Sequence, residues 1–221
     1  MKRNKMDILE EFEAFKQPKE PETSALSKKV VAIIVLISLL MIAKLAPYGS
    51  EPIIGDSLSK QIFLLYFFII SQTLGIVHEG GHGICYILHC PQFFTALNGT
   101  LFQLLFPLGV GIYYKRRGQV FPYLIGLFIF GISLHYTAWY ISTAGEGLYL
   151  PASKSFLGVD GLHDFNYILS QLHLLKFHGF IASLVRFIAY MFMFYASAKL
   201  LSLAFFSPSN KGKRRRKLKR N

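Results

Sequence analysis

The chain has 221 residues, of which 52% are hydrophobic, and 24 Lys and Arg against 12 Asp and Glu give it a net charge of +12. A mean hydropathy of +0.40 argues against a soluble globular protein. Its two cysteines, Cys85 and Cys90, exclude a disulfide framework, and a helix through both should hold their side chains too far apart to pair. We therefore expect an all-α protein that crosses a membrane several times.

The first 29 residues are rich in charged groups. Four apolar side chains, Ile8, Leu9, Phe12 and Phe15, recur there at helical spacing between polar neighbours. This pattern predicts a short amphipathic helix on the membrane surface, in a cytosolic or interfacial segment. Because no pattern of a cleaved signal peptide is present, the first apolar run is expected to stay as an anchor.

Five apolar runs follow, each about as long as a bilayer span of roughly 18 residues or more. They cover residues 30–47, 62–88, 93–114, 120–144 and 180–206. They predict a polytopic helical bundle over residues 30–206, with about four to six transmembrane segments. The third run contains Gln103 and Pro107, so we expect it to be weak, broken or re-entrant.

The last segment, residues 207–221, is a basic tail, and such a tail beside a membrane segment usually stays in the cytosol and faces lipid. It has no interleaved aromatic residues, so we do not expect it to bind nucleic acid. Five full spans would place the two ends of the chain on opposite sides. Either one run, preferably the third, does not span, or the N-terminus lies outside.

The second run contains the pentapeptide His78-Glu79-Gly80-Gly81-His82. On a helix, this HExxH pattern puts two imidazoles on one face, where they can hold one zinc ion, and leaves the glutamate free to act as a base. Such a pattern also arises by chance in soluble helices. In lipid, however, an ionised Glu79 costs several kcal/mol unless it has a partner, so the setting favours a catalytic metal site.

A catalytic zinc needs a third protein ligand, and few groups after residue 29 qualify. The densest cluster is Asp160-Gly161-Leu162-His163-Asp164. Asp164 also fits a carboxylate in the first turn of a helix, and Asp160 fits its cap. A zinc held by His78 and His82 favours Asp164, Asp160 or His163 as the third ligand, and the residues alone leave this choice open.

The fourth run carries an aromatic and polar stretch, residues 135–140. We interpret it as an aromatic belt at the membrane interface, with a polar protein interior as the alternative. Residues 145–162 are rich in Gly, Pro and Ser and predict a loop, and residues 163–177 have helical spacing of their leucines.

An HExxH embedded in the membrane and followed by a distant aspartate resembles the site-2 protease class of intramembrane zinc metalloproteases. More closely, the order is similar to a bacterial subgroup with HExxH, a Gly-Thr-x-x-Gln-x-x-x-Pro stretch (here within residues 98–107) and a His-Asp-aromatic motif (here residues 163–165). The resemblance covers roughly residues 62–175 and implies a multi-pass protein of the bacterial inner membrane.

What the resemblance implies for the site is a Zn²⁺ bound by His78, His82 and an aspartate, which by position is Asp164. Glu79 would activate water to cut a peptide bond of a membrane protein or peptide substrate, within or near the lipid bilayer. The chain lacks the Asn-x-x-Pro-x-x-x-Leu-Asp-Gly signature of another branch of the class and repeats only its last two residues, at Asp160-Gly161.

A membrane metal transporter, or a metal-binding protein without hydrolytic activity, is the alternative function. It predicts that Glu79 itself is a ligand and that other spans, through residues such as His135, carry ligands at similar depth. Transporters also tend to have paired inverted repeats, which we do not find in this sequence.

Overall fold

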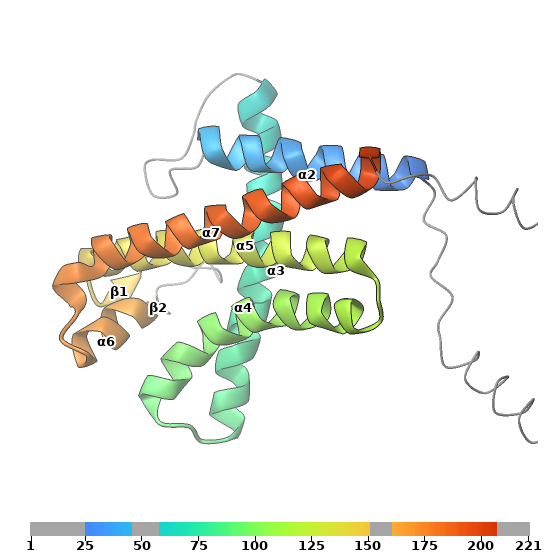
Figure 1. Cartoon of the computed structure of the whole chain (residues 1–221). Coiled ribbons are helices and arrows are strands. Elements are labelled where there is room, and N and C mark those ends of the chain that lie inside the picture. Colours follow the sequence, from blue (N-terminus) through green and yellow to red (C-terminus); the bar gives the residue numbers. More distant parts are fainter. Residues whose placement is uncertain (1–24, 46–57, 151–160, 207–221) are drawn as a thin grey trace, which may run out of the picture.

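A computed structural model describes residues 25–45, 58–150 and 161–206 (Figure 1). The predicted amphipathic segment up to residue 24, Asp160 and the basic tail lie outside the described residues. The helices, 3₁₀ turns and strands are α2 (Ala25–Leu45), α3 (Leu58–Ile87), α4 (Gln92–Arg116), α5 (Val120–Ser142), η1 (Thr143–Glu146), β1 (Tyr149–Leu150), β2 (Gly161–Leu162), α6 (Asp164–Gln171), η3 (Leu175–Phe177) and α7 (His178–Leu201), which continues as a π-helical turn, η4 (Ser202–Phe206).

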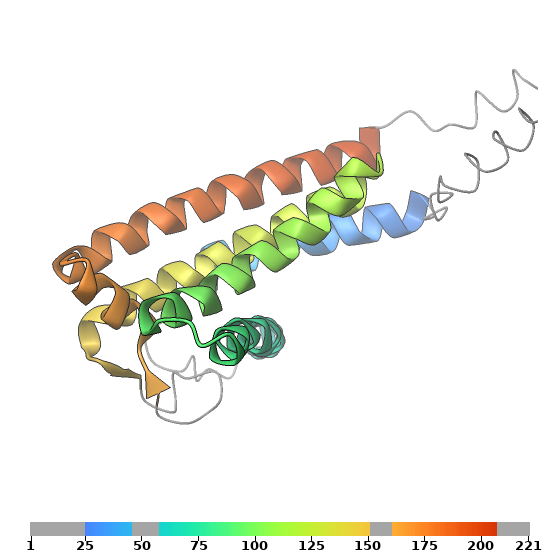
Figure 2. The ribbon, with the colours of Figure 1, turned by 90° about the horizontal axis from the view of Figure 1, so that it is seen from below.

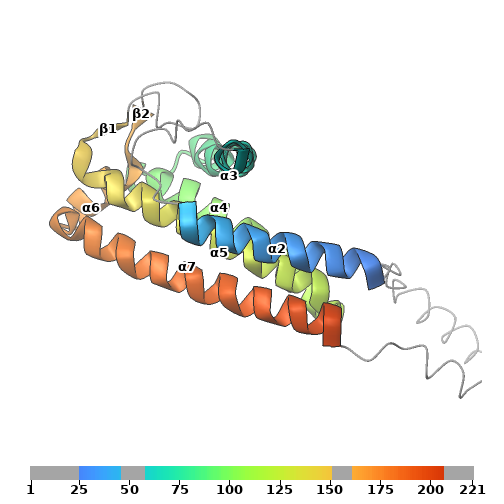
Figure 3. The ribbon, with the colours of Figure 1, turned by 90° about the horizontal axis from the view of Figure 1, so that it is seen from above.

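Four long helices, α2, α4, α5 and α7, run alongside one another (Figures 1, 2 and 3). In the described part of the chain, four segments are long and apolar enough to cross a membrane, and they coincide with the first, third, fourth and fifth predicted runs. Helix α5 packs mainly against α7 and α4. The prediction of an all-α helical bundle is therefore confirmed.

The second predicted run forms the continuous helix α3, which packs mainly against α4. It crosses the direction that the other long helices share, so it stands upright in Figure 1 and is seen end-on in Figure 2. Its own passage through the membrane stays a prediction. Its crossing brings the HExxH motif against the N-terminal half of α4, because Gly81 on α3 contacts Asn98 and Phe102.

The expectation that the third run is broken is wrong, because α4 is one continuous helix of 25 residues. Pro107 lies inside it and cannot donate to the carbonyl of Gln103, four residues earlier. Ser133 on α5 donates its hydroxyl to that carbonyl (3.2 Å), and the Gln103 amide donates to the Ser133 hydroxyl (3.0 Å). A buried reciprocal pair thus supplies the hydrogen bond that the proline removes.

The aromatic and polar stretch of α5 lies in the protein interior and not in an interfacial belt. His135, Tyr136, Trp139 and Tyr140 are all at most 7% exposed. The interpretation as a belt is therefore wrong, and the alternative of a polar interior is correct. The reason is that α5 is the central helix, flanked by α4 on one side and α7 on the other.

The predicted loop over residues 145–162 contains short regular structure at both ends. Strands β1 and β2 pair antiparallel, with Tyr149 opposite Leu162. Directly after β2, the amide of His163 donates to the carbonyl of Leu148 (2.8 Å), and α6 begins at the next residue. The single helix predicted for residues 163–177 ends early, because His173 adopts a positive φ of 57° and turns the chain towards α7.

Candidate metal centre

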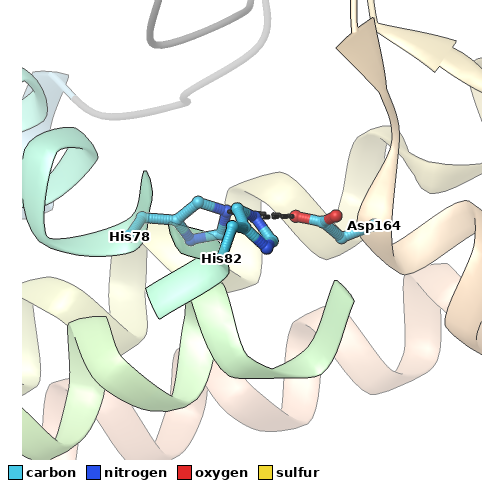
Figure 4. A group of neighbouring side chains, drawn as sticks. All are labelled: His78, His82 and Asp164. Atoms are coloured by element: carbon cyan, nitrogen blue, oxygen red, sulfur yellow. Dashed lines mark hydrogen bonds and ion pairs between the residues drawn. The ribbon is translucent and has the colours of Figure 1, made fainter. Parts of the chain in front are cut away.

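Three potential ligand atoms converge at the junction of α3 and α6 (Figure 4). The His78 Nε2 atom lies 3.0 Å from Asp164 Oδ2 and 3.0 Å from His82 Nε2, and the third edge, from His82 Nε2 to Asp164 Oδ2, measures 3.3 Å. In the described residues, no other group of three His, Cys, Asp or Glu converges in this way. We name these three residues the metal cluster.

Local and long-range structure each contribute part of this cluster. His78 and His82 lie one turn apart on the same face of α3, as the i and i+4 spacing requires. Asp164 comes from the first residue of α6, 86 residues after His78. The β1–β2 pair immediately before α6 delivers this carboxylate to the two imidazoles.

The triangle of ligand atoms fits a tetrahedral metal ion. Zinc binds histidine nitrogen and carboxylate oxygen at about 2.0–2.1 Å, so two ligands of a tetrahedral zinc lie about 3.3–3.4 Å apart. The observed edges of 3.0–3.3 Å are close to that value. Two imidazoles and one carboxylate also form a common donor set of a catalytic zinc, which keeps its fourth position open.

The orientation of His82 supports a role as a ligand. Its Nδ1–H donates to the backbone carbonyl of Thr95 on α4 (2.8 Å). This places the proton on Nδ1 and leaves the lone pair of Nε2 directed at His78 and Asp164. Metal-binding histidines usually donate their second ring nitrogen in this way, because the contact fixes both the tautomer and the ring orientation.

A glycine on α4 leaves space beside the two imidazoles. A Cβ atom at Gly99 would lie 2.5 Å from His82 Nε2 and 2.8 Å from His78 Nε2, closer than real Cβ contacts allow. On α3, Gly81 packs against Asn98, whose side-chain amide also donates to the Gly81 carbonyl (2.6 Å). Small residues at both positions therefore let α3 and α4 approach closely enough to enclose the metal cluster.

Tyr140 on α5 holds Asp164 in place from the other side. Its hydroxyl donates to Asp164 Oδ2 (3.3 Å) and lies 3.2 Å from the backbone N–H of Asp164, which donates to it. Burial raises the pKa of Asp164, but the interactions of the carboxylate with the adjacent imidazoles of His78 and His82 outweigh it, so the pKa lies below its ordinary value. The carboxylate is therefore ionised at neutral pH, as a metal ligand must be.

His163, one of the alternative third ligands, lies outside the metal cluster, and its contacts stabilise the fold. Its Nδ1 accepts from the backbone N–H of Asn166 and caps α6 (3.4 Å), and its Nε2–H donates to the hydroxyl of Thr143 (3.0 Å). The ring also stacks on Tyr140, with centroids 4.4 Å apart. His163 thus fixes the start of α6, from which the Asp164 side chain extends.

Glu79 lies on α3 directly after His78 and is partly exposed, unlike the buried His78. Its carboxylate is close enough to interact electrostatically with both His82 and Tyr140. It is therefore not one of the three converging groups, yet its charge acts on the same site.

The structure brings together three of the sequence-derived site residues, His78, His82 and Asp164, with Glu79 beside them. Sequence reasoning missed the contributions of Thr95 and Tyr140, which orient the ligands. Nothing in the sequence pairs residues so far apart along the chain. A weak signal was present for Tyr140, because polar and aromatic side chains interrupt the apolar pattern of α5 at its C-terminal end.

Comparisons of this chain with models of known protein families, with curated proteins and with solved structures found no match.

Proposed function

We propose that this chain is a membrane-embedded zinc metallopeptidase, with His78, His82 and Asp164 as the ligands and Glu79 as the general base. The observation that supports the proposal most is the convergence of the two HExxH imidazoles and a distant carboxylate within 3.0–3.3 Å. The accompanying Glu79, within electrostatic reach but outside the triangle, supplies the remaining group that peptide hydrolysis needs.

When bound at such a site, zinc lowers the pKa of a water molecule and polarises the carbonyl group under attack. The protein groups do the rest. Glu79 accepts the proton of the attacking water and later donates it to the leaving amine. Thr95 and Tyr140 hold His82 and Asp164 in position, so the ligands need not reorganise during the reaction.

The substrate class that we propose is a membrane protein or membrane-associated peptide. Two of the four helices that are long and apolar enough to cross a membrane, α4 and α5, contact the site, and many large apolar side chains of the four helices are exposed, as expected of a surface in lipid. The site-2 protease resemblance of residues 78–82 and 163–165 supports the same substrate class.

The test compares the native protein with Glu79→Gln and Asp164→Ala in detergent. Zinc content is measured by mass spectrometry, and hydrolysis is measured on a panel of single-span peptides that carry a fluorophore and a quencher. We expect about one zinc per native chain. Glu79→Gln should retain the zinc and lose hydrolysis, because the base is absent while the ligands remain.

Two results would contradict the proposal. Native protein without zinc under metal-replete conditions would exclude a catalytic zinc. Loss of zinc from Glu79→Gln would make Glu79 a ligand, as the transporter alternative requires. That alternative receives no support from His135, which is hydrogen-bonded to Tyr190 (3.2 Å) and lies outside the metal cluster.

A further inference from the structure

The C-terminal end of α3 brings Cys85 and Cys90 together, contrary to the sequence expectation that a helix would separate them. The helix does not continue through both residues but ends at Ile87. The amide of Cys90 donates to the carbonyl of Cys85 (2.9 Å), the amide of His89 donates to that of Tyr86 (3.3 Å), and His89 has a positive φ of 54°. These features define a Schellman motif.

In a Schellman motif, the side chains of the residues joined by the outer hydrogen bond meet each other. Here those two residues are Cys85 and Cys90. The 2.9 Å backbone hydrogen bond between them places the two residues side by side, and the Cys85 sulfur lies 3.8 Å from the carbonyl of Phe94. Both cysteines are free thiols in this structure.

The backbone geometry of the turn allows a disulfide. With the 2.9 Å hydrogen bond between Cys90 N and Cys85 O, standard bond lengths limit the separation of the two Cα atoms to at most about 6.8 Å. Disulfides span Cα separations of about 4.4–6.8 Å. The two Cα atoms are therefore within the reach of a disulfide, and closing the bond requires rotation of the two side chains.

The turn also has the polarity of a membrane–water boundary. His89 and Gln92 are exposed, and Cys90 is partly exposed while Cys85 is buried. Polar side chains at the end of an apolar helix are typical of the interface, where water-soluble reagents have access. A soluble disulfide reagent can therefore reach Cys90 first.

We propose that Cys85 and Cys90 form a redox-active dithiol that closes to a disulfide at the corner between α3 and α4. The thiolate of Cys90 attacks a small-molecule disulfide such as oxidised glutathione, which forms a mixed disulfide and releases one thiol. The thiolate of Cys85 then attacks the Cys90 sulfur and releases the second thiol. Two electrons pass to the glutathione, and two protons leave the cysteines.

The corner is linked to the metal cluster through covalent and hydrogen-bonded contacts. Cys85 follows His82 by three residues on α3. The Thr95 hydroxyl is 3.4 Å from the carbonyl of Cys90, and the Thr95 carbonyl accepts from His82. The disulfide would thus fix the turn that positions the Thr95 contact with a metal ligand. The dithiol proposal itself requires neither zinc nor hydrolysis.

The experiment exposes the folded, detergent-purified full chain to buffers of increasing oxidised-to-reduced glutathione ratio and then blocks the remaining thiols with an alkylating reagent. Intact-mass spectrometry distinguishes the products. We expect loss of two hydrogens and no alkylation, at ratios where protein unfolded in SDS is still reduced. The Cys90→Ser variant, with one thiol left at Cys85, should show no such loss.

Either of two results would overturn the proposal. Glutathione attached to one cysteine, with no internal disulfide, would show that the second thiol cannot reach the mixed disulfide. Equal ease of oxidation in folded and unfolded protein would show that the Schellman turn does not promote closure. The far-ultraviolet circular dichroism of the oxidised chain should match that of the reduced chain, because the proposed closure leaves the helix in place.

Discussion

Two buried histidine environments in this protein differ in what surrounds the imidazole. His78 meets a second imidazole and a carboxylate that approach from α3 and α6. His135 on α5 is fully buried and meets the hydroxyl of Tyr190 on α7 (3.2 Å). In both, the Nε2 atom of the buried ring is hydrogen-bonded, as is usual for a buried polar atom. Among the described residues, the ligand atoms of three His, Cys, Asp or Glu side chains converge only around His78. Burial of a histidine in an apolar bundle therefore does not by itself indicate a metal site.

The difference arises from how the helices meet. Helices α5 and α7 run side by side, and a Cβ at Gly131 would collide with Met193, which shows how closely they pack. Helix α3 instead crosses α4, and Gly81 and Gly99 lie at the crossing. In this protein, the two helices that pack side by side are joined by a hydrogen bond at His135, whereas the crossing beside the start of α6 leaves room for three converging side chains.

The largest expected change in zinc affinity follows removal of the Asp164 carboxylate, which has no counterpart beside His135. In Asp164→Ala, the two imidazoles would remain without their anionic ligand, so zinc affinity should fall by more than about 100-fold. Competition with a chromophoric chelator measures the affinity. Retention of native affinity would mean that Asp164 does not bind the metal, and the cluster would then resemble the His135 environment.

The second prediction concerns the space at the crossing of α3 and α4. In Gly99→Ala, the new methyl group would overlap His82 Nε2, so the imidazole rings or the helices must shift. We expect a stability loss of about 1–3 kcal/mol and a reduction of zinc affinity by about tenfold or more. Gly109→Ala on the same helix is the matched control, because nothing lies within 4 Å of its Cβ position. Thermal unfolding and chelator competition should separate the two variants, and equal behaviour would contradict the crossing argument.

The third prediction compares the tyrosines that serve the two environments. Tyr140→Phe removes the hydroxyl that donates to Asp164 and should weaken zinc binding by about tenfold. Tyr190→Phe removes the hydroxyl beside His135 and should leave zinc affinity unchanged. A shift in the absorption bands of bound Co²⁺ in Tyr140→Phe would report altered ligand geometry, which a general loss of stability does not produce. Equal zinc affinities of the two variants would contradict a positioning role of Tyr140.

The smallest expected effect on metal binding is that of His135 itself. His135→Gln should retain the full zinc content and lose about 1 kcal/mol of stability, because one interhelical hydrogen bond is disturbed. Mass spectrometry and thermal unfolding measure the two quantities. Loss of zinc from this variant would mean that His135 belongs to the metal site, and it would favour the transporter alternative.

Agreement between sequence and structure follows the range of the interactions involved. The apolar runs predicted helices correctly because helix formation in an apolar setting depends on local hydrogen bonding and composition. The aromatic and polar stretch of α5 was misassigned, since the same residues suit a belt or an interior and only packing decides. Pro107 misled the prediction for α4, because the compensating Ser133 lies on another helix.

The sequence by itself determined the helical runs. It also determined that His78 and His82 share one helix face, because an i and i+4 pair lies on one face of any α-helix. Only the tertiary structure decided that Asp164 reaches that pair while His163 caps α6. It also decided that Thr95 and Tyr140 orient the ligands and that a turn unites Cys85 with Cys90. The physical reason is that helical periodicity is a property of neighbouring residues, whereas convergence of distant side chains depends on how close-packed helices cross.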